Sequence, residues 1–263
     1  MDKTKYQIIF VDIDWTILNH NIGDWDYDSL EVLKKLQSQG VLVYLNTARP
    51  YDSIIHTDLL DIFTPDGIAC TSGGVVFIKD KILYANVIPE AIVREIEEIA
   101  DRHHLVLELA TTKERHFTAP ANEYVHRYFS VFREVIPTIK KYENEDVSAI
   151  LLFAPEEYDE VLLKELPKET NYLRFDSCGV DVGYHENSKG KAIKAILKHL
   201  NIDRENAVAV GDSNDDISMF KEVGLSIAMG NGKVEAQNEA NIVCDTIDNH
   251  GLAKELIEIF DLK

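Results

Sequence analysis

Two aspartates, Asp12 and Asp14, come directly after the first apolar segment of the chain, residues 6–11. That segment is rich in β-branched and aromatic side chains and predicts a fully buried strand. Strand periodicity places the two carboxylates on the same side, where like charges repel unless a cation or a proton lies between them. The arrangement is unfavourable for folding alone and therefore indicates a function.

Further polar side chains stand at comparable positions along the chain. Thr47 and Asp212 each follow an apolar, strand-like segment, and Lys189 lies at the start of a predicted helix. In an open α/β sheet, ligands bind beyond the carboxyl ends of the strands. If the strands are parallel, these side chains converge with the first two aspartates on one edge of the sheet.

These residue types suit a phosphate dianion bound beside a hard divalent cation. Carboxylates and backbone carbonyls are oxygen ligands that Mg²⁺ prefers, Thr47 offers a hydroxyl donor, and Lys189 supplies a positive point charge. Two unit charges about 4 Å apart interact by about 4 kcal/mol at an effective dielectric near ~20, so a carboxylate that attacks a dianion needs positive charge nearby. Asp12 is then the candidate nucleophile, giving an aspartyl-phosphate, and Asp14 the candidate general acid and base.

The elements that must position these residues alternate between strand and helix at both ends of the chain. Predominantly apolar strands are predicted, among others, at residues 41–45, 67–70, 207–210 and 225–229, with helices at 28–39 and 252–260. Such strands with helical crossovers imply a parallel sheet covered on both faces. We expect an α/β fold whose core is a Rossmann-like, doubly wound, mostly parallel sheet.

The middle of the chain has a different pattern. An amphipathic helix at residues 89–100 is followed by strand-like segments, and a polar segment at 176–181 predicts a turn that is a candidate substrate loop. We therefore expect a core built from residues 1–83 and 187–263, with an α+β cap domain at residues 84–186 inserted between them.

Composition excludes several classes of partner. The 263 residues carry a formal net charge of −19, which argues against binding to nucleic acid or to an anionic membrane. The three cysteines are widely spaced and lack the spacing of a metal site, and Cys70 and Cys244 lie in apolar, strand-like segments that predict buried, inert thiols. No apolar stretch has the length of a signal peptide or a membrane span. We expect a cytoplasmic protein, monomeric, with a small-molecule phosphate ester as its partner.

The chain resembles the haloacid dehalogenase-like hydrolases and, among them, the Cof-type phosphatases with a large inserted cap. The resemblance covers both predicted core segments, whereas the cap matches only in size and position. Four motifs in the family's order carry it: Asp12-Ile13-Asp14-Trp15-Thr16, Thr47-Ala48-Arg49-Pro50, Ser188-Lys189-Gly190, and Gly211-Asp212 through Asp216 with Met219.

The resemblance implies a role for each aspartate. Asp12 is implied to be the nucleophile and a metal ligand, and Asp14 the acid and base, with its main-chain carbonyl on Mg²⁺. Asp212 is implied to be the third protein ligand of the metal. Asp215 and Asp216 are expected in or near the layer of residues around these direct ligands.

The resemblance also assigns the phosphate-binding groups. Thr47 and Lys189 are implied to hold the phosphate, and Arg49, Ser72 and Gly73 are further candidates for binding phosphate or substrate. For Arg49, an ion pair with a core acid is an equal alternative. Thr47 could instead cap the following segment, and Lys189 could be an exposed lysine in a first helical turn.

Three positions depart from the family's pattern. Trp15 stands where glycine is most usual, Ser72 where asparagine is common, and Asp215 at a position often held by asparagine. The additional carboxylate could alter metal affinity. Trp15 could form an apolar wall facing the leaving group or the cap, or could simply pack against the cap.

The expected function is Mg²⁺-dependent hydrolysis of a small phosphorylated metabolite, such as a sugar phosphate, through an aspartyl-phosphate. A phosphotransferase or phosphomutase would use the same aspartate with a sugar hydroxyl as acceptor. A non-enzymatic, metal-dependent phospho-switch module is the alternative outside enzymes. A dehalogenase is disfavoured because Asp14 and the metal ligands have no role in that reaction.

Overall fold

The chain folds into two compact units in the computed structural model, which describes residues 5–79, 81–132 and 135–262. The first unit comprises Met1–Ala48, Leu59–Leu83 and Ser188–Lys263, and the second comprises Arg49–Asp58 and Tyr84–Asn187. Residues 49–58 group with the second unit, although in the chain they connect two strands of the first.

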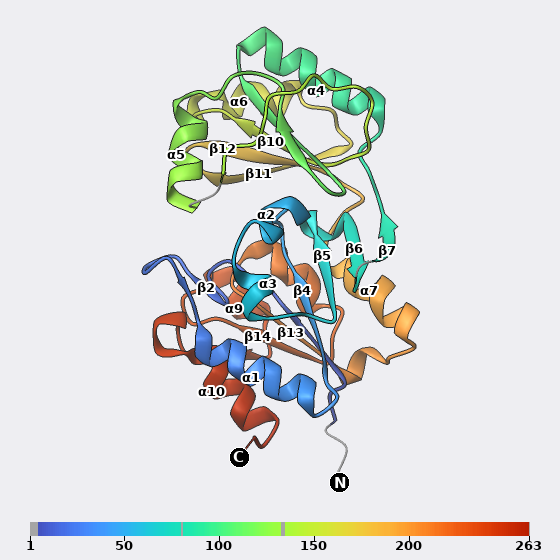
Figure 1. The fold of residues 1–263 in the computed structure, drawn as a ribbon, viewed down its shortest axis with the longest axis vertical. Helices are drawn as coiled ribbons and strands as arrows, with labels where there is room; N and C mark the ends of the chain where they lie inside the picture. The colour runs from blue at the N-terminus through green and yellow to red at the C-terminus, as the bar shows by residue number, and fades with distance from the viewer. Residues whose placement is uncertain (1–4, 80, 133–134, 263) are drawn as a thin grey trace. The chain divides into compact units, whose positions relative to one another are not determined.

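The first unit is built on a mostly parallel sheet, as predicted (Figure 1). In spatial order, the first six strands of this sheet pair in parallel, and the seventh pairs antiparallel with the sixth. The central strands are buried along their whole length, which explains their continuous apolar sequence. Within the described residues, the spatial order is β15 (Ile242–Val243), β14 (Leu225–Ala228), β13 (Ala207–Gly211), β1 (Ile8–Val11), β4 (Leu42–Asn46), β5 (Gly67–Cys70), β6 (Val75–Ile78) and β7 (Lys81–Ala85).

Helices cover both faces of this sheet. The crossovers from β1 through α1 (Tyr27–Ser38) to β4 and from β13 through α8 (Ile217–Phe220) to β14 run in opposite directions along the sheet. Because such crossovers are right-handed, the two helices lie on opposite faces. α10 (Gly251–Ile259) packs beside α1, and α7 (Lys189–Leu200) packs beside α8. The strand order therefore reverses between β1 and β13, where a ligand site is expected.

Several short elements complete the first unit. β2 (Leu18–Asn19) and β3 (Asp24–Trp25) form a small antiparallel hairpin that the sequence analysis did not predict. Two residues in each strand are too few to show a period-two pattern. The other short elements are α3 (Leu59–Ile62), α9 (Val234–Glu239) and the 3₁₀ helices η1 (Thr71–Gly73), η3 (Arg204–Asn206), η4 (Asn214–Asp216) and η5 (Ile247–Asn249).

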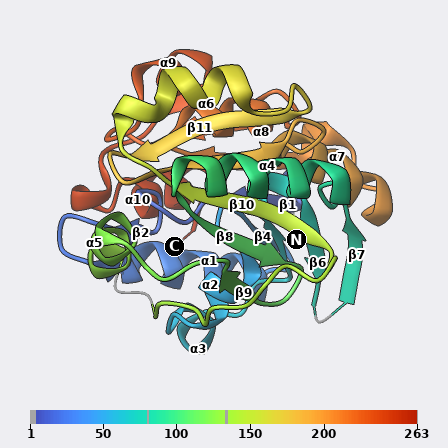
Figure 2. The same ribbon diagram turned by 90° about the horizontal axis from the view of Figure 1, so that it is seen from above.

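The second unit contains an antiparallel sheet with helices on both faces (Figure 2). Alternate side chains of its central strand enter two apolar clusters, one shared with α4 and α6 and the other with α5. The spatial order of the strands is β11 (Thr170–Asp176), β12 (Gly179–Tyr184), β10 (Val147–Phe153), β8 (Val106–Thr111) and β9 (Arg115–Phe117). The helices are α2 (Tyr51–Ile55), α4 (Glu90–His103), α5 (Glu123–Phe132), the 3₁₀ helix η2 (Glu156–Tyr158) and α6 (Asp159–Glu165).

The predicted turn between two strands of this unit is confirmed, but it is shorter than the segment 176–181. β11 and β12 pair as far as Asp176 and Gly179, and only two residues connect them. Cys178 in that connection is fully buried, and the contact of this turn with substrate stays a prediction. The prediction of buried thiols at Cys70 and Cys244 is confirmed, and Cys178 is a buried free thiol as well. No helix in the described ranges is both long and apolar enough to traverse a bilayer.

Candidate active site

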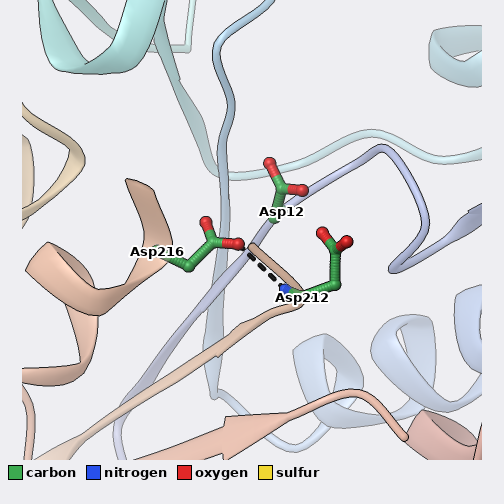
Figure 3. A group of neighbouring side chains, drawn as sticks. All are labelled: Asp12, Asp212 and Asp216. Carbon is green, nitrogen blue, oxygen red and sulfur yellow. Dashed lines mark hydrogen bonds between the residues drawn. The ribbon is translucent and has the colours of Figure 1, made fainter. Parts of the chain in front are cut away.

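A group of three buried carboxylates lies where the strand order of the first unit reverses. The backbone N–H of Asp12, directly after β1, donates to the carbonyl of Val210 in β13 at 3.0 Å, which joins the ends of the two strands. Carboxylate oxygens of Asp12, Asp212 and Asp216 all lie within 4.8 Å of one another (Figure 3). We refer to these three side chains as the carboxylate cluster.

The turn after β13 positions two members of the cluster. Its backbone folds into η4, and the carboxylate of Asp216 accepts hydrogen bonds from the N–H groups of Asp212 and Ser213, each at 2.9 Å. Asp216 therefore acts as a helix-capping group and fixes the position of Asp212. A Cβ atom at Gly211 would lie 2.3 Å from the carboxyl carbon of Asp216, so glycine is required there.

Lys189 is buried against the cluster rather than exposed in the first turn of its helix. Ser188 caps α7 by accepting a hydrogen bond from the N–H of Lys191. The Lys189 Nζ lies 2.8 Å from Asp12 Oδ1, 2.6 Å from Asp216 Oδ1 and 2.9 Å from Asp215 Oδ2. One ammonium group thus contacts three of the four aspartates gathered here.

Burial and neighbouring charges together disfavour ionisation of the three carboxyl groups in the cluster. Burial raises the pKa of Asp12 well above its usual range, with Lys189 opposing the shift and Asp216 adding to it. Burial together with Asp216 raises the pKa of Asp212 to about 8. The pKa of Asp216 is also raised, chiefly by burial and against the effect of Lys189. A carboxyl group that is hard to ionise in a buried site indicates that positive charge is insufficient there.

For Lys189 and Asp215, in contrast, the surroundings favour the charged form. Burial opposes ionisation of Lys189, yet Asp12, Asp215 and Asp216 raise its pKa well above the usual value, so it remains charged. Burial also opposes ionisation of Asp215, but Lys189 and a hydrogen bond from Ser213 hold the pKa of this carboxyl below its usual range. Lys189 and Asp215 therefore form the ionised pair at the margin of the cluster.

The carboxylate cluster fits a hard divalent cation. Three oxygen donors converge in a buried place, and their raised pKa values reflect a lack of positive charge that such an ion would supply. Asp216 was expected in or near the layer around the direct ligands, whereas its carboxylate lies in the cluster with Asp12 and Asp212. Asp14 is not a member of the cluster.

The side chain of Asp14 points to another partner. Its Oδ1 lies 2.7 Å from Nε2 of His20, which follows β2 in the small hairpin. The sequence offered no signal for this contact, because the hairpin itself was not predicted. Trp15, the next residue, adopts a left-handed backbone conformation with φ of 58°.

Thr47 lies at the end of β4, next to the start of α7. It is buried, and its N–H donates to the carbonyl of Ala69 at 2.9 Å. The side-chain amide of Asn46 donates to the carbonyl of Lys189 at 3.0 Å. Asn46 was missed in the sequence analysis, although its place at the end of a buried strand was a usable signal. These bonds hold Thr47 beside the helix that carries Lys189.

Ser72 and Gly73 form the turn η1 against the same helix. The Ser72 N–H donates to the carbonyl of Thr47 at 3.1 Å. Gly73 has φ of 84°, and a Cβ atom there would lie 2.2 Å from the carbonyl oxygen of Ser188. Only glycine allows this close approach of η1 to the N-terminus of α7.

Arg49 belongs to the second unit of the chain. It is buried, and its Nη1 donates to Ser53 Oγ at 3.3 Å, one turn along α2. Its predicted contact with substrate stays a prediction.

Comparison with known families identifies the class of protein. The model of the haloacid dehalogenase-like hydrolase family matches residues 9–256, and the chain belongs to this family. The sequence motifs and the relatives below place it with the Cof-type members.

Individual relatives match over nearly the whole length of the chain. YkrA of Bacillus subtilis (strain 168) is 27% identical over 263 residues, covering 98% of this chain and 99% of its own. The 5-amino-6-(5-phospho-D-ribitylamino)uracil phosphatase YitU of the same organism is 24% identical, covering 99% of this chain and 100% of its own. The chain is accordingly a phosphatase of this hydrolase family.

Solved structures share its fold. A protein from Geobacillus kaustophilus HTA426 superposes with a TM-score of 0.88 at 25% identity, covering 97% of this chain and 98% of the other. The sugar phosphatase BT4131, of subclass IIB of the haloacid dehalogenase superfamily, superposes with a TM-score of 0.85 at 24% identity, covering 98% and 100%. The prediction of an α/β core with a cap is thereby confirmed.

Proposed function

We propose that this phosphatase hydrolyses a small phosphorylated metabolite, such as a sugar phosphate, with Mg²⁺ and through an aspartyl-phosphate on Asp12. The observation that carries the proposal is the pairing of Asp12 with Lys189 at 2.8 Å beside a buried carboxylate cluster. Phosphoryl transfer requires a nucleophile, a positive charge and oxygen ligands for a cation at one place. Asp12, Lys189 and the carboxylate cluster would supply these three.

Asp12, Asp212 and the main-chain carbonyl of Asp14 would hold the Mg²⁺ ion, with Asp216 close by. When bound, the ion neutralises charge on the transferring phosphoryl group and lowers the repulsion between that group and the carboxylates. The raised pKa values of Asp12 and Asp212 support this assignment, because added positive charge would allow both to ionise.

The side chains divide the chemistry into two displacements at phosphorus. In the first, a carboxylate oxygen of Asp12 forms the new P–O bond, the ester P–O bond breaks, and Asp14 donates a proton to the departing alcohol oxygen. In the second, Asp14 takes a proton from water, the water oxygen bonds to phosphorus, and the Asp12 carboxylate leaves. Lys189 offsets negative charge on the phosphoryl oxygens in both steps.

We assign phosphate binding to the residues that surround the start of α7. Thr47 and Ser72 would donate hydrogen bonds to phosphate oxygens, and Gly73 would allow the turn to approach them closely. We assign Arg49 to contacts with the remainder of the substrate, since it is a guanidinium group two residues after Thr47.

The proposed substrate class agrees with the names of relatives and with the charge of the chain. YitU acts on a phosphoribitylamino compound, and a relative from Saccharolobus solfataricus that is 20% identical is a phosphoglycolate phosphatase. Both names describe small phosphate esters. The net charge of −19 is unfavourable for a nucleic-acid substrate. Buried reduced cysteines suit a cytoplasmic location, and we propose a monomer.

A panel of phosphate esters assayed with Mg²⁺ and with EDTA tests the proposal. We expect release of inorganic phosphate from small esters only with Mg²⁺, and none from the Asp12→Asn variant. Transfer of the phosphoryl group to a sugar hydroxyl instead of water would identify a phosphotransferase. Binding of phosphate esters without turnover in the wild-type protein would contradict the proposal and favour a phospho-switch module.

A further inference from the structure

The carboxyl group of Asp14 is held by a histidine that no sequence motif includes. Nε2 of His20 lies 2.7 Å from Asp14 Oδ1, and the His20 side chain is only 13% exposed. A bond of this length to a largely buried ring restricts both the rotamer of Asp14 and the plane of its carboxyl group. General acid–base catalysis depends on such geometry, because the proton must be delivered along one direction.

The indole ring of Trp15 lies against the imidazole ring of His20. The two ring centroids are 5.0 Å apart, at an interplanar angle of 46°. The backbone of Trp15 has φ of 58°, which is unfavourable for a bulky side chain and easily adopted by glycine. A residue kept at a backbone cost usually has a compensating role, and the contact with His20 supplies one.

The hairpin that carries His20 is tied to the C-terminal part of the first unit. Asn19 and Asn21 in the hairpin both donate side-chain hydrogen bonds to Asp248, the former at 2.8 Å. The side-chain amide of Asn231 donates to the carbonyl of Trp15 at 2.9 Å, and its oxygen accepts from the N–H of Ile247. Both ends of the Trp15–His20 segment are therefore fixed to residues 247 and 248.

We propose that His20 is a positioning residue for the acid–base carboxyl of Asp14, and that Trp15 supports it by fixing the imidazole ring. The inference rests on the proposed function, in which Asp14 donates a proton to the leaving oxygen. His20 binds one oxygen of Asp14 and thereby sets the orientation of the carboxyl group that exchanges the proton. His20 itself exchanges no proton with the substrate.

Substrates that differ in their need for a proton test this role. An alkyl phosphate loses a poor leaving group that must be protonated, whereas p-nitrophenyl phosphate loses a stable anion. kcat/KM reports the steps up to departure of the alcohol. We expect His20→Ala to lower kcat/KM for the alkyl ester by roughly 10- to 100-fold, a part of what general acid catalysis contributes, and that for the aryl ester by less than about 3-fold.

Two further variants make the test independent of any folding defect. His20→Gln keeps an N–H donor near the same place and should recover part of the activity on the alkyl ester. Trp15→Gly relieves the left-handed backbone and so should fold, yet it should move the alkyl-to-aryl ratio of kcat/KM in the same direction as His20→Ala. His250→Ala is the matched control, because it removes another histidine–aspartate pair, with Asp26 at 2.7 Å, that does not contact Asp14.

The outcomes separate this inference from the proposed function. If the alkyl-to-aryl ratio of kcat/KM is unchanged in both His20→Ala and Trp15→Gly, the positioning role is overturned, even though Asp12 remains essential. Full activity in Asp12→Asn would instead overturn the proposed function itself. A shift of the same size in His250→Ala would show that loss of any such pair has this effect and would also reject the inference.

Discussion

Each unit of the chain buries a cation among carboxylates, and the two arrangements differ in their balance of charge. In the second unit, Arg115 donates to Asp52 at 2.9 Å and to Glu108 at 3.2 Å, and its guanidinium lies over the ring of Phe129. In the first unit, Lys189 contacts Asp12, Asp215 and Asp216, with Asp212 beside them.

The difference indicates that Arg115 belongs to a structural network, whereas Lys189 belongs to the proposed active site. The fork of Arg115 matches two carboxylates that come from α2 and β8, so it ties these elements together. Lys189 is a point charge among four aspartates, and Asp12, Asp212 and Asp216 have raised pKa values as a result of burial and mutual repulsion. The four aspartates around one lysine leave an excess of negative charge, and this excess is the physical feature that supports the proposed catalytic site.

Removing the nucleophile should have the largest effect on activity. We expect Asp12→Asn to lower kcat by about 10⁴-fold or more, the scale seen when a nucleophile is lost, because an amide oxygen cannot form the phosphoryl ester. Steady-state assays with Mg²⁺ measure the loss, and thermal unfolding checks the fold. Asp28→Asn, an exposed acid-to-amide change in the same unit, should retain full activity.

The Lys189→Met substitution should cause the next largest loss of activity, through a lower kcat. The apolar chain fills similar space but cannot offset charge on the phosphoryl oxygens, so we expect kcat to fall by roughly 10²- to 10³-fold. The same assays measure it. If the variant keeps activity within a few fold of wild type, Lys189 has no catalytic role and does not differ from Arg115 in this respect.

Arg115→Ala should instead reduce stability. It leaves the fully buried Glu108 without its guanidinium partner, which typically costs about 3–5 kcal/mol of unfolding free energy. Urea unfolding of the full chain measures this change. The double variant Arg115→Met/Glu108→Leu should regain most of the loss, and a loss smaller in Arg115→Ala than in the double variant would contradict a paired, structural role.

The Asp212→Asn substitution should change how the stability of the metal-free protein depends on pH. The folded-state pKa of Asp212 is about 8, against about 3.9 for a free aspartate, so the folded state keeps a proton that the unfolded state has lost. The stability of the metal-free protein should therefore fall as pH rises from about 3.9 to about 8, and the full loss is reached above the folded-state pKa.

The variant lacks that group, so its stability relative to wild type should be greater at pH ~8.5 than at pH ~5. Urea midpoints measured in EDTA test the difference. A constant gap at both pH values would count against an electrostatic origin, and Mg²⁺ should restore stability only to the wild-type protein.

The core of the first unit could be predicted because its strands are apolar throughout and end in polar motifs. The same logic located Asp12, Thr47 and Lys189 before any geometry was known. It could not place Asp216 in the carboxylate cluster, since that depends on how one 3₁₀ turn folds back onto Gly211. Spacing along the sequence carries no information on such a turn.

The elements that escaped prediction are the short ones. β2, with two residues, and β9, with three, are below the length at which periodicity appears. The partners they bring, His20 for Asp14 and Arg115 for Asp52 and Glu108, were missed with them. The turn predicted at residues 176–181 is shorter than expected for another reason, because most residues of that segment belong to the paired strands of a hairpin.

The stereochemical course at phosphorus tests the central claim most directly. Each in-line displacement inverts the configuration of a chiral, isotopically labelled phosphorothioate ester, so transfer first to Asp12 and then to water should give net retention. Retention in the wild-type enzyme is the result that this account predicts. Net inversion would show direct attack by water and would contradict the role of Asp12 as nucleophile.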